Sequence, residues 1–166
     1  MRGVIRNKER ILSDEDTRKL IESTEHGVLA TVNALGQPCT TALNHVFLDG
    51  ALYFHSGPEG EKLDNIRANP QVSYFIVDVA EVLYDQFTTA FSSVVANGAI
   101  QFVDDPEEKL RALTALVNRF SNEIIPAQVK TDFIADGVNC VVMLKLVPEQ
   151  LTGKARLSRK RPCLNY

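Results

Sequence analysis

The chain has 166 residues, of which 45% are hydrophobic and 23% are charged. This length is enough to bury one core, and the composition is that of a globular protein rather than a collagen-like, coiled-coil or disordered chain. The sequence has no apolar run long enough to cross a membrane, and its first residues lack the apolar segment of a signal peptide. We therefore expect a single soluble, cytoplasmic domain over residues 1–166.

Cysteine and histidine spacing argues against a disulfide framework and against a structural metal site. The chain has three cysteines, an odd number without a CxxC pair, and three histidines without HxxxH or HExxH spacing. These residues are Cys39, Cys140, Cys163, His26, His45 and His55. We expect no bound metal.

The net charge of −3 is unevenly distributed. Residues 1–10 and 154–166 together hold nine basic side chains and one acidic one, so the remainder of the chain is acidic. These tails are either anion contacts or solvated chain ends, and the acidic remainder argues against a nucleic-acid binder. No Lys or Arg lies between Lys19 and Lys62, so an anion bound in the middle of the chain must use Lys62, Arg67 or a tail.

Capping and turn signals place the elements of the first half. Ser13-Asp14-Glu15-Asp16 is a capping box that begins a helix ending near Thr24. Branched residues and turn signals then predict three strands. The strands cover residues 27–32, 40–48 and 51–56. Asp49-Gly50 is a strong signal for a hairpin between the last two strands.

The second half continues the same pattern. A helix is expected over residues 61–69, stopped by Asn69-Pro70, and a further helix begins at Asp105-Pro106 with Leu110, Leu113, Val117 and Phe120 on one face. Strands are expected at residues 72–77, 93–103 and 139–147, with a connecting loop at 78–91. Gly98, inside a strand, indicates a bulge or a close approach. Since no βαβ alternation is present, we predict a mainly β fold, an antiparallel six-stranded sheet closing into a small barrel with peripheral helices.

The hairpin fixes which side chains share a face. A two-residue turn pairs Leu48 with Ala51, and the same register continued outward sets Asn44 opposite His55 and His45 opposite Phe54. His45 then lies with Phe47, Leu52 and Phe54 on the more apolar face, and we expect it to be a hydrogen-bonded core residue. His55 shares the other face with Tyr53, so the two histidines cannot bind one metal.

The segment from His55 to Lys62 has the features of a phosphate-binding turn. It joins a strand end to a helix start, where free N–H groups and the positive end of the helix dipole attract anions. Gly57 and Gly60 allow a close backbone approach, and Lys62 adds a cation. The plainer interpretation is a surface loop with one lysine.

Two stretches of sequence carry a family resemblance. The run Pro38-Cys-Thr-Thr-Ala-Leu-Asn-His-Val-Phe-Leu-Asp-Gly-Ala-Leu-Tyr-Phe-His-Ser-Gly-Pro-Glu-Gly-Glu-Lys62, followed by Asn69-Pro70-Gln71-Val72, resembles the FMN-binding split-barrel family. Within that family it is similar to the nitroimidazole-resistance-type branch of the pyridoxamine 5′-phosphate oxidase-like proteins. Ser92 to Gly98 resembles a later strand of the same branch.

The resemblance implies a six-stranded split barrel and a homodimer with one FMN in each of two interfacial clefts. It implies an FMN-dependent oxidoreductase that reduces nitro compounds or other small organic acceptors, and the alternative is a flavin- or haem-binding protein without turnover. Lys62 falls where the family holds the FMN phosphate, and His55 is either a proton donor beside the flavin or a hydrogen-bonded interface histidine. The other implied cofactor-binding residues are Thr41, Ala42, Leu43, Asn44, Phe54, Ser56 and Ser93.

Two departures from the oxidases narrow the expected substrate. Thr41 stands where the oxidases often have an arginine. The chain has no Trp, and residues 154–159 lack the histidine of the arginine–histidine pair that grips a vitamin phosphate. We therefore expect a small-molecule substrate other than pyridoxamine 5′-phosphate, with no nucleic-acid or membrane partner.

Overall fold

The computed structural model describes residues 5–121 and 123–156. The helical elements are the short 3₁₀ helices η1 (Lys8–Arg10) and η2 (Tyr84–Gln86) and the α-helices α1 (Asp14–Ser23), α2 (Glu61–Ala68), α3 (Pro106–Phe120) and α4 (Ala127–Cys140). The strands are β1 (His26–Val32), β2 (Pro38–Asn44), β3 (Val46–Leu48), β4 (Ala51–Ser56), β5 (Gln71–Leu83), β6 (Thr88–Phe102), β7 (Val142–Leu146) and β8 (Gln150–Arg156).

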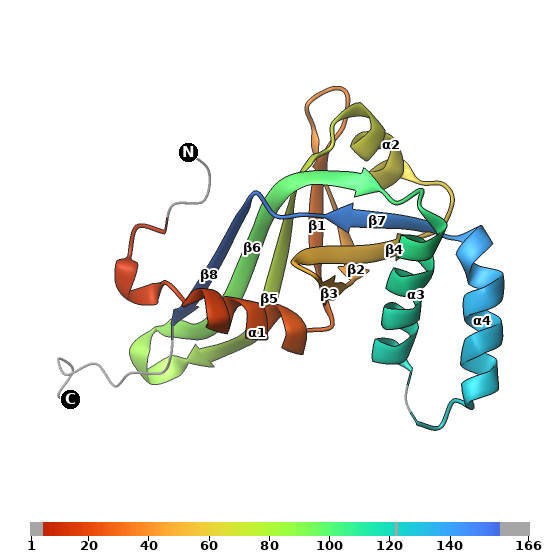
Figure 1. Ribbon diagram of the computed structural model, residues 1–166. Helices are drawn as coiled ribbons and strands as arrows, with labels where there is room; N and C mark the ends of the chain where they lie inside the picture. The colour runs from red at the N-terminus through yellow and green to blue at the C-terminus, as the bar shows by residue number, and fades with distance from the viewer. Residues whose placement is uncertain (1–4, 122, 157–166) are drawn as a thin grey trace.

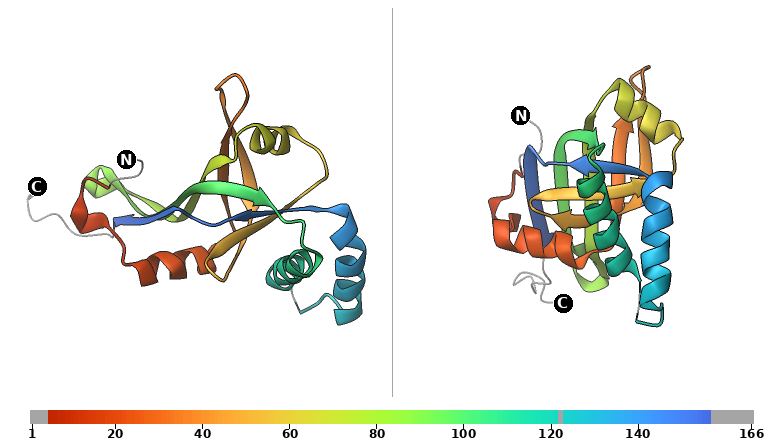
Figure 2. Two further views of the ribbon diagram at one scale, coloured as in Figure 1. Left: turned by 45° about the horizontal axis from the view of Figure 1, so that its top comes forward. Right: turned by 45° about the vertical axis from the view of Figure 1, so that its right-hand side comes forward.

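The strands form one curled antiparallel sheet with the order β2-β1-β5-β6-β7-β4-β3, and β8 pairs separately with β6. Figures 1 and 2 show α2 at one end of the curl, α1 beside β6 and β8, and α3 and α4 together on the outside. The prediction of a mainly β split barrel with peripheral helices is confirmed. The described residues contain eight strands rather than six.

Two groups of buried side chains hold this arrangement. The larger group fills the curl of the sheet and includes Leu52, Phe54 and Tyr74, with Leu20 and Ile21 of α1 closing it from one side. The smaller group lies on the opposite face of β4, between the sheet and α3. Both faces of β4 are therefore buried over most of its length, because a helix covers the face that an isolated hairpin would leave in water.

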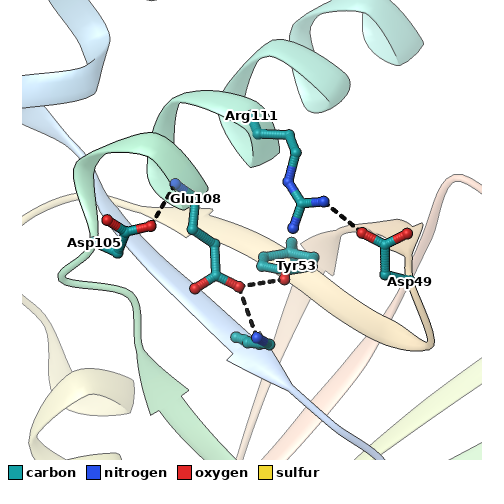
Figure 3. Close-up of polar contacts among 6 residues, drawn as sticks. Asp49, Tyr53, Asp105, Glu108 and Arg111 are labelled. Carbon is teal, nitrogen blue, oxygen red and sulfur yellow. Dashed lines mark hydrogen bonds and ion pairs between the residues drawn. The ribbon is translucent and has the colours of Figure 1, made fainter.

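A polar cluster joins α3 to the strands beneath it (Figure 3). Oε1 of Glu108 accepts hydrogen bonds from Tyr53 Oη at 2.6 Å and from Lys145 Nζ at 2.7 Å. Asp105 caps the same helix by accepting from the Glu108 N–H at 3.0 Å, and Arg111 forms an ion pair with Asp49 of the hairpin turn. These contacts fix how α3 lies on β4 and β7.

The predicted hairpin register is confirmed near the turn and wrong beyond it. Leu48 pairs with Ala51 and Val46 with Tyr53, and Asp49 and Gly50 both have positive φ, 51° and 82°. The expected single strand over residues 40–48 is broken at His45, however. Asn44 pairs with His26 of β1 rather than with His55, because the chain crosses here from one part of the sheet to another.

His45 makes that crossing possible. Its buried ring lies with Nε2 2.9 Å from the Ile21 carbonyl and Nδ1 3.0 Å from the Tyr74 hydroxyl, which is also 2.7 Å from the Leu43 carbonyl. Nε2–H therefore donates to Ile21, and the single phenolic proton has two acceptors within reach. Burial lowers the pKa of His45 to about 4. The expectation of a hydrogen-bonded core histidine is confirmed.

Three further expectations need correction, and two elements of the structure were not predicted. The segment 78–91 is not a loop, because β5 continues to Leu83 and β6 begins at Thr88, with η2 between them. Helix α4 and strand β8 were not anticipated. The predicted strand at 139–147 begins only at Val142, because its first residues belong to α4. Of the predicted α3 stripe, Leu113 is buried and Val117 half-buried, whereas Leu110 and Phe120 are exposed.

Gly98 is a point of close approach, as expected. A Cβ at this position would lie 2.8 Å from the Val147 carbonyl oxygen and 3.1 Å from the Glu149 nitrogen. Of the basic C-terminal stretch, Lys154 and Arg156 lie in β8, and residues 157–166 are outside the described part of the chain. No helix within the described residues is long and apolar enough to cross a membrane.

Candidate functional site

The turn between β4 and α2 has the local features of an anion site. Gly60 caps α2 with φ of 137°, a conformation that favours glycine, and no side chain caps the first N–H groups of the helix. A Cβ placed on Gly60 would lie 3.9 Å from Lys62 Nζ, so the ammonium group lies beside the turn. Positive charge and free N–H donors thus meet at one place.

Ser56 adds a buried polar group that lacks a partner. Its side chain is on the same face of β4 as Phe54, and Oγ is buried with no hydrogen-bond partner among the described residues. Buried hydroxyls are normally hydrogen-bonded, so an unpaired one next to a glycine turn fits a loop that binds a ligand oxygen. On this observation the residues present fit a phosphate group.

Lys62 is the cation that this turn leaves unpaired. Arg67, the other basic side chain of α2, forms an ion pair with Asp64 at 2.9 Å. No ion pair of Lys62 occurs within residues 5–121 and 123–156. Lys62 and Arg67 are the two candidate anion-binding residues that the sequence places near this turn, and of these two Lys62 is the one without an ion pair in the described structure.

His55 lies at the end of β4, opposite Met143 of β7, with an exposed side chain. Partial burial, and then the nearby Lys62 ammonium, lower the pKa of His55 below its ordinary value. The imidazole is therefore neutral near pH 7 and carries one N–H donor and one acceptor nitrogen. The effect of the Lys62 charge indicates that His55 lies close to the turn.

The remaining predicted residues fall into three environments. On β2, Thr41 and Leu43 are half-buried, whereas Ala42 and Asn44 are exposed. Phe54 is fully buried and packs edge-on against Tyr74, so its side chain offers no surface to a ligand. β2 contacts both β4 and α2, so these strands and the turn belong to one region of the fold.

Ser93 lies apart from that region within the chain. It sits on β6 opposite Val77 of β5 and Lys154 of β8, and its Oγ donates to the Lys154 carbonyl at 3.4 Å. It lines a surface cavity of about 760 Å³ that does not include His55 or Lys62. The walls of this cavity include Phe75 and Val77, which are 43% and 42% exposed.

Sequence reasoning missed the contacts between α2 and the strands below it. Cys39 Sγ donates to Glu61 Oε1 at 3.1 Å, and this hydrogen bond raises the pKa of the thiol. Asn65, buried on α2, donates to Thr31 Oγ1 at 3.1 Å. The raised pKa disfavours the thiolate, so Cys39 anchors α2 and is not activated as a nucleophile. Within the described residues no group of three or more His, Cys, Asp and Glu could hold a metal ion.

The sequence model of the family described as pyridoxamine 5′-phosphate oxidase matches residues 13–155, most of the chain. The chain belongs to the pyridoxamine 5′-phosphate oxidase family. No curated protein sequence matches it significantly. The resemblance seen in the segment from Pro38 to Lys62 is thereby confirmed at the level of the family.

Solved structures of several other proteins share the fold. A protein from Bacteroides thetaiotaomicron assigned to 5-nitroimidazole antibiotic resistance is 22% identical, with a TM-score of 0.71 over 87% of this chain and 86% of that one. An FAD-binding protein from Mesorhizobium loti is 25% identical, with a TM-score of 0.65 over 89% and 97%. The haem storage protein HutZ from Vibrio cholerae is 20% identical, with a TM-score of 0.64 over 85% and 94%.

Proposed function

We propose that the protein is an FMN-binding oxidoreductase whose turn between β4 and α2 holds the cofactor phosphate. The observation that carries this proposal is the buried, unpaired Ser56 Oγ at the end of β4, before a turn that has an unpaired Lys62 and an uncapped helix start. Membership of the pyridoxamine 5′-phosphate oxidase family supports it, as does the likeness to an FAD-binding protein. FMN fits better than a cofactor without phosphate, because every feature of the turn favours an anion.

Each residue of the site has a separate task in this proposal. Lys62 neutralises phosphate charge, and the N–H groups at the start of α2 donate to its oxygens. A phosphate oxygen would give Ser56 Oγ the hydrogen-bond partner that it lacks. The exposed side of β2, with Ala42 and Asn44, would hold the flavin ring.

A bound flavin supplies hydride or electron transfer to a small organic acceptor, such as a nitro compound. The neutral imidazole of His55 holds a proton on one nitrogen and accepts one on the other, so it is suited to proton transfer at the edge of the cofactor. Its depressed pKa keeps it in this form at physiological pH. Tyr53 is not available for this role, because its hydroxyl is committed to Glu108.

The proposal includes a homodimer with a cofactor at the interface. Phe75, Val77 and Val28 are large apolar side chains exposed on β1 and β5, and together with Phe91 they give the sheet an apolar face. A face of this kind on a sheet favours association. Ser93 lines the same face, so in a dimer it would serve the cleft of the other protomer rather than its own.

A haem-binding protein without turnover is the second candidate, favoured by the likeness to HutZ and by the exposed, neutral imidazole of His55. The absorbance spectrum of the purified chain separates the two. FMN gives a yellow protein that oxidises reduced nicotinamide faster when an acceptor is added, whereas haem gives a Soret band. A colourless protein that takes up no added FMN at micromolar concentration overturns the proposal.

Lys62→Ala tests the position of the phosphate. Losing a charge-assisted hydrogen bond of ~1.5–3 kcal/mol weakens FMN binding by roughly 10- to 150-fold. Lys109→Ala is the matched control, since this lysine lies on α3 and has no ion pair within the described part of the chain. Equal FMN affinity of the two variants contradicts the assignment of the phosphate to this turn.

A further inference from the structure

A second cavity lies on the other side of β4 from Ser56. It has a volume of about 310 Å³, opens to solvent, and is lined by α3, α4 and the segments at their ends, with His55 at the strand edge. This volume is in the range of small-ligand sites. Because neighbouring side chains of a strand point to opposite faces, His55 faces this cavity while Ser56 belongs to the inner face of the sheet.

The wall of the cavity is almost entirely apolar. It is formed by side chains of α3 and α4 and of the segment that joins them, with Val141 after α4. The apolar residues are Leu113, Leu116, Val117, Phe120, Ile125, Val129, Phe133 and Val141. Phe133 is 59% exposed and Phe120 is 38% exposed, so the wall presents aromatic surface that a ligand can contact.

Two polar groups in the same wall have no partner. Ser121 Oγ is buried and makes no hydrogen bond in the described structure. Lys130 is half-buried and forms no ion pair there. No acidic residue lines the cavity within the described residues, so its net character is apolar with one positive charge.

Both unpaired groups lie toward one end of the helix pair. Ser121 directly follows α3, and Lys130 is in the first turns of α4. Figure 1 shows that the chain leaves α3 and enters α4 at this same end, with the end of β4 toward the other. The cavity thus has a polar donor end, an apolar middle and a neutral imidazole at its far side.

We propose that this cavity binds a small aromatic or branched-chain carboxylate. The apolar body packs against Val117, Phe120 and Phe133, and the carboxylate oxygens accept hydrogen bonds from Ser121 Oγ and Lys130 Nζ. A buried hydroxyl without a partner and an unpaired ammonium are both satisfied by one anionic group, which an uncharged apolar ligand does not provide. Ser56 and Lys62 do not line this cavity, so the inference does not depend on phosphate binding at the turn, although His55 borders both sites.

The test uses 2-naphthoate and its uncharged analogue 2-naphthamide as probes on the purified full chain. Naphthalene fluorescence is read directly, because the protein contains no Trp. We expect 2-naphthoate to bind more tightly than 2-naphthamide. Lys130→Gln and Ser121→Ala should each weaken naphthoate binding by about tenfold. Lys130→Gln should leave the affinity for naphthamide unchanged.

Controls separate this result from misfolding and from the flavin site. Lys109→Gln removes a lysine of α3 that does not line the cavity and should leave naphthoate affinity unchanged. Lys62→Ala should weaken FMN binding without affecting naphthoate. Val117→Phe fills part of the cavity without introducing a Trp and should weaken binding of both probes, with an unchanged circular dichroism spectrum showing that the fold is kept.

Three outcomes overturn the inference. The first is no binding of naphthoate at millimolar concentration. The second is equal affinity for the acid and the amide, with no effect of Lys130→Gln. The third is a dimer that Phe133→Asp dissociates and that binds no probe, because a second copy of the chain is then the occupant of the cavity.

Discussion

Removing the Glu108 carboxylate tests how α3 is held on the sheet (Figure 3). Its side chain is 24% exposed and that of Lys145 is 27% exposed, so the ion pair is only partly screened by water. Tyr53 is almost fully buried, and Glu108 is the hydrogen-bond partner of its hydroxyl in the described structure. In Glu108→Ala, Lys145 can regain water, but the phenol cannot.

The expected cost follows from these exposures. A hydrogen bond to a charged group contributes roughly 1.5–3 kcal/mol, and leaving a buried hydroxyl unpaired costs about 1–3 kcal/mol. Both contacts are lost in Glu108→Ala, but the partly exposed ion pair contributes only about 0–1 kcal/mol, so the unpaired Tyr53 hydroxyl accounts for most of the cost. We therefore expect Glu108→Ala to lower the free energy of unfolding by about 2 kcal/mol.

Urea denaturation at pH 7 measures this change. Glu107→Ala is the matched control, since it removes an exposed acid from the same helical turn and costs only the dipole interaction of ~0.3–1 kcal/mol. In a Tyr53→Phe background the cost of Glu108→Ala should shrink to below about 1 kcal/mol, because the phenol no longer needs a partner. Equal losses for Glu107→Ala and Glu108→Ala would refute the reasoning.

The same contact predicts a pH dependence. The hydrogen bonds from Lys145 and then Tyr53 lower the pKa of Glu108 in the folded protein. The Glu108 carboxylate is therefore protonated more readily in the unfolded chain than in the folded one. The stability that its hydrogen bonds contribute is fully present above the unfolded pKa and is lost as the pH falls through the folded pKa. The stability difference between the native chain and Glu108→Ala should accordingly narrow in acid.

Three other changes have defined outcomes. Lowering the pH from 7 to 5 should reduce the free energy of unfolding by about 2 kcal/mol through His45, because its folded pKa of about 4 lies below the ordinary 6.5 and the unfolded chain gains the proton first. Urea denaturation at several pH values should show a weaker pH dependence of this free energy for His45→Gln. Gly98→Ala should lower the free energy of unfolding by about 1–3 kcal/mol, because the added Cβ meets the backbone at Val147. A Cβ added at Gly57 meets nothing within 4 Å, so Gly57→Ala should leave the melting temperature nearly unchanged. Gly60→Ala should lower the free energy of unfolding by about 1–3 kcal/mol, because alanine is strained at a φ of 137°, and it should also weaken FMN binding. An unchanged FMN affinity would argue against a phosphate at this turn.

Local signals in the sequence predicted the elements that local chemistry decides. The Ser13 and Asp105 caps are where the sequence placed them, each accepting from a backbone N–H three residues on. The hairpin at Asp49-Gly50 follows from the positive φ that a two-residue turn requires. The phosphate-type turn before α2 could also be predicted from local signals, because its glycines, the helix start and the lysine are close together in the sequence.

Features that depend on tertiary contacts were not predictable from the sequence. The break at His45 exists because Ile21 and Tyr74, far away in the chain, supply its hydrogen bonds. Helix α4 has no fully buried residue, so its apolar side chains gave no clear helical stripe. The long β5–β6 hairpin exposes Tyr84 and Phe87 at 83% and 88%, so alternation of apolar and polar residues did not reveal it.

The position of strand β6 determines how the protein unfolds. Along its length it is bonded to β5, β7 and β8, so the barrel and the projecting hairpin share one continuous piece of backbone. Separating any one neighbour leaves the other ladders in place, and releasing β6 itself breaks all of them at once. Amide protons in the central part of β6 should therefore exchange with deuterium only when the whole chain unfolds. Local opening should begin instead at η1 and at the tip of the β5–β6 hairpin, which includes the first residues of β6.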